Sequence, residues 1–185
     1  MCFFGVFDGH SGRRACEYAR DNLPRQVHTE LSKAEPDEAL RRAFLKTDEE
    51  FLKIANKEGL GDGSTAITAL VRGRTLWVAN AGDARAILVS GSTAIAMSED
   101  HKPNRESERR RITQAGGTVT FMGCWRVNGV LATFTTWAAT PWKAVQANTL
   151  LEETKKIAKE IKALPRAVCS PISMHHSCPY MVAVL

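Results

Sequence analysis

The stretch Phe-Phe-Gly-Val-Phe-Asp-Gly-His-Ser-Gly at positions 3–12 joins an apolar run directly to a polar, glycine-rich turn. A short aromatic and apolar run that stops this abruptly is typical of a buried strand, so we expect a strand over residues 3–7. A strand that ends in a glycine-rich turn places side chains and carbonyl groups at the rim of a sheet, where a hard cation finds oxygen ligands. Asp8 is therefore a candidate metal ligand, although an aspartate at such a place often caps the following helix instead.

Helical periodicity follows this turn, over residues 12–33 and 37–57. In the second stretch apolar residues recur at steps of three and four, which predicts that one face packs on a sheet, and Gly59 lies where the helix would end. A further short surface helix is predicted at 104–115. Short strands separated by tight turns favour antiparallel hairpins, and we expect them at 64–71, 75–81, 85–90, 93–97, 118–122 and 125–132.

The composition is that of an ordinary single domain, with 44% hydrophobic residues in 185 positions. The net charge of +5 comes without a basic stripe and interleaved aromatics, so we predict no nucleic-acid partner. The five cysteines are odd in number and widely spaced, which argues against a disulfide framework and favours a reducing compartment. Because no apolar run is long enough to span a membrane, we expect a soluble protein without a membrane partner. We also expect it to be a monomer in the cytoplasm or nucleus.

Two other turns contain an aspartate. Asp83 lies in a sharp turn between apolar strands, where an aspartate most often only shapes the turn. The loop Gly-Asp-Gly-Ser-Thr at 61–65 is similar to a phosphate-binding loop, but it lacks the Gly-Lys-Ser/Thr ending and the helix that should follow. We therefore reject a nucleotide-binding loop and expect these glycines to serve a tight turn before a strand.

Seven blocks in a fixed order carry a more specific signal: FGVFDGHSG at 4–12, GSTA at 63–66, ANAGDAR at 79–85, DHKP at 100–103, Glu108 with Arg111 and Ile112, AGG at 115–117, and RVNGVLA at 126–132. In this order they resemble the successive motifs of the metal-dependent protein serine/threonine phosphatases of type 2C, the PPM family. The resemblance runs from about residue 3 to residue 132.

The resemblance implies an α+β fold in which α-helices flank a sandwich of two antiparallel β-sheets, with two Mg²⁺ or Mn²⁺ ions at one end. It assigns Asp8 to both metals through its carboxylate and Gly9 to one of them through its carbonyl. Asp83 would help to hold a weaker third ion. The implied reaction is hydrolysis of phosphoserine or phosphothreonine in phosphorylated proteins by a metal-activated water. His10 would protonate the leaving oxygen, for which an ordinary histidine pKa near 6.5 is suitable, so Asp8 and His10 are the predicted catalytic residues.

The resemblance stops after Ala132. The family has an upstream strand with a phosphate-gripping arginine, and later aspartates that bind metal, whereas the last aspartate here is Asp100. We therefore expect a truncated chain with a partial phosphatase-like region at 1–132 and a divergent tail at 133–185. The tail should pack on the same domain and contain an amphipathic helix at 150–164. With few carboxylates, metal affinity and turnover should be impaired.

Two alternatives stay open at this point. The chain could be a catalytically inactive, phosphatase-like binding or regulatory module that uses the tail helix as a docking face. A zinc site could also form in the tail from Cys169, His175, His176 and Cys178, but this spacing is unusual for structural zinc.

Overall fold

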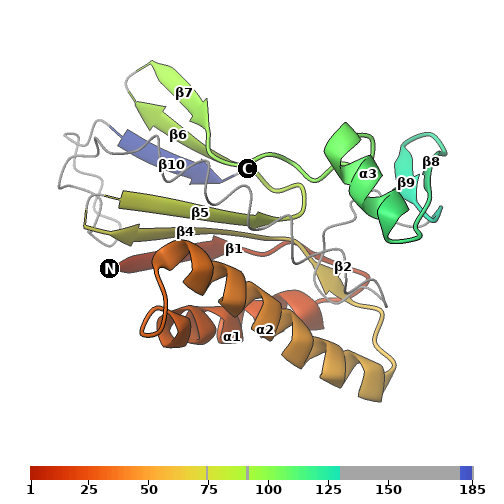
Figure 1. Ribbon diagram of the computed structural model, residues 1–185, viewed down its shortest axis with the longest axis horizontal. Coiled ribbons are helices and arrows are strands. Elements are labelled where there is room, and N and C mark those ends of the chain that lie inside the picture. The colour runs from red at the N-terminus through yellow and green to blue at the C-terminus, as the bar shows by residue number, and fades with distance from the viewer. Residues whose placement is uncertain (74, 91, 130–179, 185) are drawn as a thin grey trace.

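Two antiparallel sheets lie face to face in the computed structural model, which describes residues 1–73, 75–90, 92–129 and 180–184 (Figure 1). The first sheet has the order β1 (Cys2–Val6), β4 (Ala66–Arg72), β5 (Thr75–Ala81). The second has the order β10 (Tyr180–Val184), β6 (Ala86–Ser90), β7 (Thr93–Ala96). Two short strands, β2 (Gly9–His10) and β3 (Gly63–Ser64), pair beside the first sheet. The predicted α+β sandwich and its antiparallel hairpins are confirmed.

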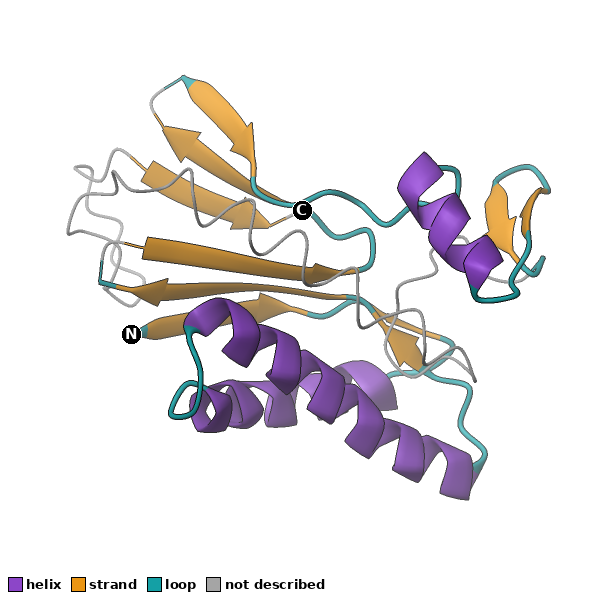
Figure 2. Ribbon diagram, viewed as in Figure 1, coloured by secondary structure: helices purple, strands orange, loops and turns teal. Residues whose placement is uncertain are grey.

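Two long helices, α1 (Arg14–Glu30) and α2 (Pro36–Glu58), cover the outer face of the first sheet (Figure 2). Helix α2 begins with a proline followed by two acidic residues, which suits a helix start because the ring presets φ and carboxylates interact favourably with the helix dipole. It ends at Gly59, as predicted. The predicted apolar face is buried at Leu40, Phe44, Thr47 and Phe51.

Strand β4 lies at the centre of the structure and is buried on both faces. Ala66 and Leu70 face the helices and join the core formed with α1, α2 and β5. Ile67, Ala69 and Val71 face the other way and pack in a second core with Leu88 of β6 and Met97. Alternation along a strand sends successive side chains to opposite faces, so a strand between two cores needs a nearly continuous apolar run, which in β4 only Thr68 interrupts between Ala66 and Val71.

Strand β1 forms where it was predicted, but its burial is only partial. Phe3 packs on the helix-side core, whereas Phe4 and Val6 are 55% and 47% exposed. Among the described strands β1 pairs only with β4 and stands at the margin of its sheet, and its first residue, Cys2, packs against the core shared with the second sheet. The expectation of a fully buried strand was wrong for this face.

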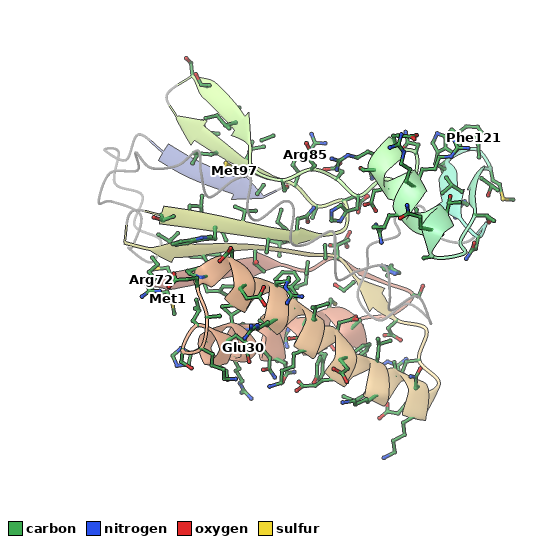
Figure 3. The ribbon with its side chains drawn as sticks, viewed as in Figure 1. Met1, Glu30, Arg72, Arg85, Met97 and Phe121 are labelled. Atoms are coloured by element: carbon green, nitrogen blue, oxygen red, sulfur yellow. The ribbon has the colours of Figure 1, made fainter. Side chains whose placement is uncertain are left out.

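A small separate unit contains α3 (Glu106–Gln114), β8 (Val119–Phe121) and β9 (Trp125–Val127). The two strands form their own antiparallel sheet rather than extending the sandwich, and their core consists of Ile112 and Val127 with neighbouring apolar residues. Figure 3 shows Phe121 on the side of this unit that faces away from the sandwich, and that side chain is 62% exposed. The predicted helix at 104–115 is confirmed.

Several expectations concern residues that the structure does not describe. The predicted helix at 150–164, the four candidate zinc ligands and the last residues of the strand expected at 125–132 all lie outside the described ranges. Within the predicted tail, β10 is described and pairs antiparallel with β6. The division of the chain after residue 132 stays a prediction. No helix in the described part of the chain has the length and apolar character needed to cross a membrane.

Candidate functional site

The turns that contain Asp8 and Asp83 lie at the same end of the first sheet. Strands β1 and β5 are both antiparallel to β4, so they run in the same direction and their C-terminal ends lie together (Figure 1). Val6 pairs with Ile67, and Ala81 pairs with the adjacent Ala66. Two strands that flank a third are separated by about 10 Å, twice the spacing of neighbouring strands. The topology therefore brings the two candidate ligand turns together.

The main chain of Asp8 is held by residues just before β4. The Thr65 N–H donates to the Asp8 carbonyl at 2.8 Å, and the Asp8 N–H donates to Thr65 Oγ1 at 3.2 Å. Ser64 Oγ, which donates to the Thr65 carbonyl at 2.7 Å, also lies 3.2 Å from the Asp8 carbonyl. The next two residues, Gly9 and His10, pair with Ser64 and Gly63 as β2 and β3. With its backbone bonded to the protein, Asp8 is left exposed at the sheet rim.

Asp62, and not Asp8, bonds the start of α1. Its Oδ2 accepts from the Arg14 N–H at 3.0 Å and its Oδ1 accepts from Arg14 Nη2 at 2.8 Å, while Asp62 is only 1% exposed. The hydrogen bond from the Arg14 side chain is the main reason that the pKa of Asp62 is lowered. Gly12 permits this approach, because a Cβ there would lie 2.0 Å from Asp62 Oδ2. The loop at 61–65 thus holds the Asp8 turn as well as starting a strand, which sequence reasoning missed.

The turn of Asp83 is held by the segment that follows β7. His101 is fully buried, its Nδ1 accepts from the Gly82 N–H at 3.1 Å, and its own N–H donates to the Gly82 carbonyl at 3.0 Å. Asn80 Nδ2 donates to the same carbonyl at 3.1 Å. Sequence reasoning gave His101 no role, since neither neighbour in the chain suggested a partner. The only sign of this role in the sequence is that a histidine stands in the DHKP block at 100–103.

The carboxylate of Asp83 is paired with Lys102 in this structure. The Asp83 side chain is 28% exposed and that of Lys102 is 47% exposed. Arg85, on the same turn, donates from Nε to Asp100 Oδ1 at 2.9 Å, and Figure 3 shows Arg85 between the second sheet and α3. A cation that binds the Asp83 carboxylate would have to compete with the ammonium group of Lys102.

His10 lies within the electrostatic reach of both turns. Burial lowers its pKa below the ordinary value, although the carboxylates of Asp8 and Asp83 both act to raise it. The expectation of an ordinary pKa near 6.5 was therefore wrong, because half-burial of the imidazole outweighs the two negative charges. Nε2 of His10 is buried and has no hydrogen-bond partner among the described residues. Such an atom is available to a ligand bound at the rim.

The donor atoms at this end of the sheet fit a hard divalent cation in kind. A carboxylate at Asp8, a carbonyl at Gly9 and a carboxylate at Asp83 are the oxygen ligands that Mg²⁺ and Mn²⁺ prefer. They are few in number, and the described residues contain no group of three or more histidine, cysteine, aspartate or glutamate side chains placed to hold a metal. The roles assigned to Asp8, Gly9, His10 and Asp83 stay predictions.

Comparison with known proteins gives concordant matches. Residues 2–133 match the family model described as Protein phosphatase 2C. Over 134 residues, 71% of this chain, the sequence is 49% identical to "Probable protein phosphatase 2C member 13, mitochondrial" of Oryza sativa subsp. japonica, of which it covers 37%. The name of this relative refers to mitochondria. The cytoplasmic or nuclear location expected for the present chain stays a prediction.

Two solved structures share the fold. A sex-determining protein of C. elegans aligns with a TM-score of 0.73 and 27% identity over 79% of this chain and 38% of that chain. A serine-threonine phosphatase 2C from Toxoplasma gondii aligns with a TM-score of 0.58 and 27% identity over 65% of this chain and 46% of that one. The present chain spans less than half the length of each of these proteins and of the rice relative.

Proposed function

Because this chain belongs to the protein phosphatase 2C family, we propose that it takes part in Mg²⁺- or Mn²⁺-dependent hydrolysis of phosphoserine and phosphothreonine in protein substrates. One observation supports this most directly: β1 and β5 both pair antiparallel with β4, so the turns of Asp8 and Asp83, far apart in the sequence, lie at the same end of the first sheet. Two carboxylates and an imidazole at one rim of a sheet are the groups needed to bind a cation and to hydrogen-bond a phosphate ester.

Each residue has a defined part in this proposal. Phosphate monoester hydrolysis is very slow unaided, and a bound metal pair supplies charge neutralisation and a water of lowered pKa. Asp8 would hold the metals through its exposed carboxylate, Gly9 through its carbonyl, and Asp83 would hold a weaker ion. His10 Nε2 would hydrogen-bond the leaving serine or threonine oxygen. Burial lowers the pKa of His10 in the free protein, which disfavours the protonated form that a general acid needs.

We further propose that metal binding and turnover by this chain are weak. The affinity of a hard cation increases with the number and charge of its oxygen ligands. No aspartate follows Asp100, and the Asp83 carboxylate is partly neutralised by Lys102.

Phosphate release from a phosphothreonine peptide, with and without Mn²⁺ and with a chelator, tests the proposal. We expect slow release that requires Mn²⁺, is abolished by chelation, and falls to the blank rate in Asp8→Asn. Asp21→Asn is the matched control, because Asp21 is an exposed aspartate on α1 that pairs with its neighbour Arg20, and it should keep the wild-type rate. Release that survives Asp8→Asn would refute the assignment of Asp8. Release at the blank rate from the wild type as well would favour a catalytically inactive binding module.

A further inference from the structure

We propose that His101 is the positioning residue for Asp83: as the tautomer protonated on Nε2, it locks the Gly82–Asp83 turn through hydrogen bonds to both polar groups of Gly82. The proposal rests on the proposed role of Asp83 as a metal ligand. It concerns how that ligand is held, and His101 itself touches neither metal nor substrate.

The geometry specifies the tautomer. Nδ1 of His101 lies 3.1 Å from the Gly82 nitrogen and accepts its N–H, so Nδ1 must offer a lone pair. In a neutral imidazole the proton then sits on Nε2. The main-chain N–H of His101 donates back to the Gly82 carbonyl at 3.0 Å, and these two hydrogen bonds close a ring between the residues. The side chain is 0% exposed, so water does not compete for Gly82 there.

Gly82 needs such an external lock. Its φ is +118°, a backbone conformation that glycine reaches easily but for which it has no strong local preference. Asn80 supports the same arrangement, because its Nδ2 donates both to the Gly82 carbonyl at 3.1 Å and to the Glu99 carbonyl at 3.1 Å. The hydrogen bonds, rather than the intrinsic preference of the turn, select one conformation and thereby the place of the next residue, Asp83.

Consecutive residues of the segment from Glu99 to Lys102 contact the turn that contains Gly82 and Asp83. Asp100 accepts from Arg85, His101 binds Gly82, and Lys102 pairs with Asp83. Of these three contacts only that of His101 is both buried and directed at the backbone, as the Asn80 hydrogen bond to Gly82 also is, whereas the other two are ion pairs with a partner about half exposed. We therefore infer that His101 contributes most to fixing the conformation of the Gly82–Asp83 turn.

The test compares His101→Asn with His101→Leu in the full chain. The Oδ1 atom of asparagine can take the place of Nδ1 as acceptor, whereas leucine fills the space without offering one. Because removing an outer-shell partner of a metal ligand typically weakens metal binding 10- to 100-fold, we expect the Kd for Mn²⁺, measured by electron paramagnetic resonance, to rise about tenfold in His101→Leu. In His101→Asn it should stay within about threefold of wild type.

A double-mutant comparison separates positioning from general structural damage. In an Asp83→Asn background, His101→Leu should cause no further loss of Mn²⁺ affinity. A loss of the same size in that background would overturn the proposal, because the residue would then act on the site without Asp83.

A measurement on metal-free protein tests the hydrogen bonds to Gly82 independently of the proposed function. In metal-free, ¹⁵N-labelled wild-type protein, an N–H···N hydrogen bond transmits a scalar coupling between the Gly82 amide nitrogen and Nδ1 of His101. We expect this coupling, and its absence would overturn the proposed lock whatever the variants do. If Asp83→Asn alone leaves Mn²⁺ binding unchanged, the ligand role of Asp83 fails, and with it the positioning of a ligand by His101; a coupling that is still observed would then establish the turn lock alone.

Discussion

Replacing Asp62 by alanine removes the side chain that connects the loop at 61–65 to the start of α1. The carboxylate accepts one main-chain and two side-chain hydrogen bonds from Arg14, and it is 1% exposed. The Arg14 side chain is 56% exposed, so water can replace much of what its guanidinium loses.

The expected loss of stability follows from these contacts. Removing a helix cap costs about 1 kcal/mol, and a hydrogen bond to a charged group contributes about 1.5–3 kcal/mol. Counting the cap in full and the half-exposed arginine at the lower limit gives about 2–3 kcal/mol for Asp62→Ala. That is a large share of the roughly 5–15 kcal/mol that stabilise a typical domain. Asp62→Asn keeps the shape and loses the charge, so about half of this loss is expected.

The pH dependence has a definite sign. The pKa of Asp62 is lowered in the folded chain, mainly by the hydrogen bond from Arg14. A lowered pKa contributes stability above the unfolded value of about 3.9, and this contribution disappears as the pH falls through the folded pKa. Asp62→Asn has no such contribution to lose, so its stability difference from wild type should be full near pH 7 and shrink below about pH 4.

Urea unfolding followed by circular dichroism, at about pH 7 and about pH 3, measures these differences. Asp21→Asn is the control for removal of an exposed aspartate from α1, and it should leave the unfolding midpoint unchanged. An Asp62→Ala protein with the wild-type midpoint would refute the reasoning. So would a difference between wild type and Asp62→Asn that is as large at about pH 3 as at about pH 7.

Three further substitutions probe the same turns. Gly12→Ala should destabilise the fold by about 1–3 kcal/mol, because its Cβ would lie 2.0 Å from Asp62 Oδ2 at a φ of +147°. Gly61→Ala, where a Cβ meets nothing within 4 Å, should be close to neutral, and equal urea midpoints for the two variants would contradict the predicted clash. Lys102→Met should tighten Mn²⁺ binding about two- to fivefold by releasing the Asp83 carboxylate from a partly exposed ion pair. A Kd unchanged by Lys102→Met in a paramagnetic resonance titration would show that the ion does not reach Asp83.

Local patterns in the chain predicted most of the helices and strands in its described part. The periodicity of α2 and its terminal Gly59 predicted a helix that is observed at Pro36–Glu58. Apolar runs separated by tight turns predicted the hairpins of β4 with β5 and of β6 with β7. These features depend on backbone preferences and on the spacing of apolar residues, which act over a few positions and are therefore visible in the sequence.

The contacts that hold the two turns could be found only in the folded chain. Asp62 binds Arg14 across 48 positions, and His101 binds Gly82 across 19, and no periodicity connects either pair. The partial exposure of β1 and the lowered pKa of His10 likewise depend on which layer covers which side chain. Hydrogen bonding and burial are set by distances in space, so tertiary packing decides them while the local sequence decides only which elements are available to pack.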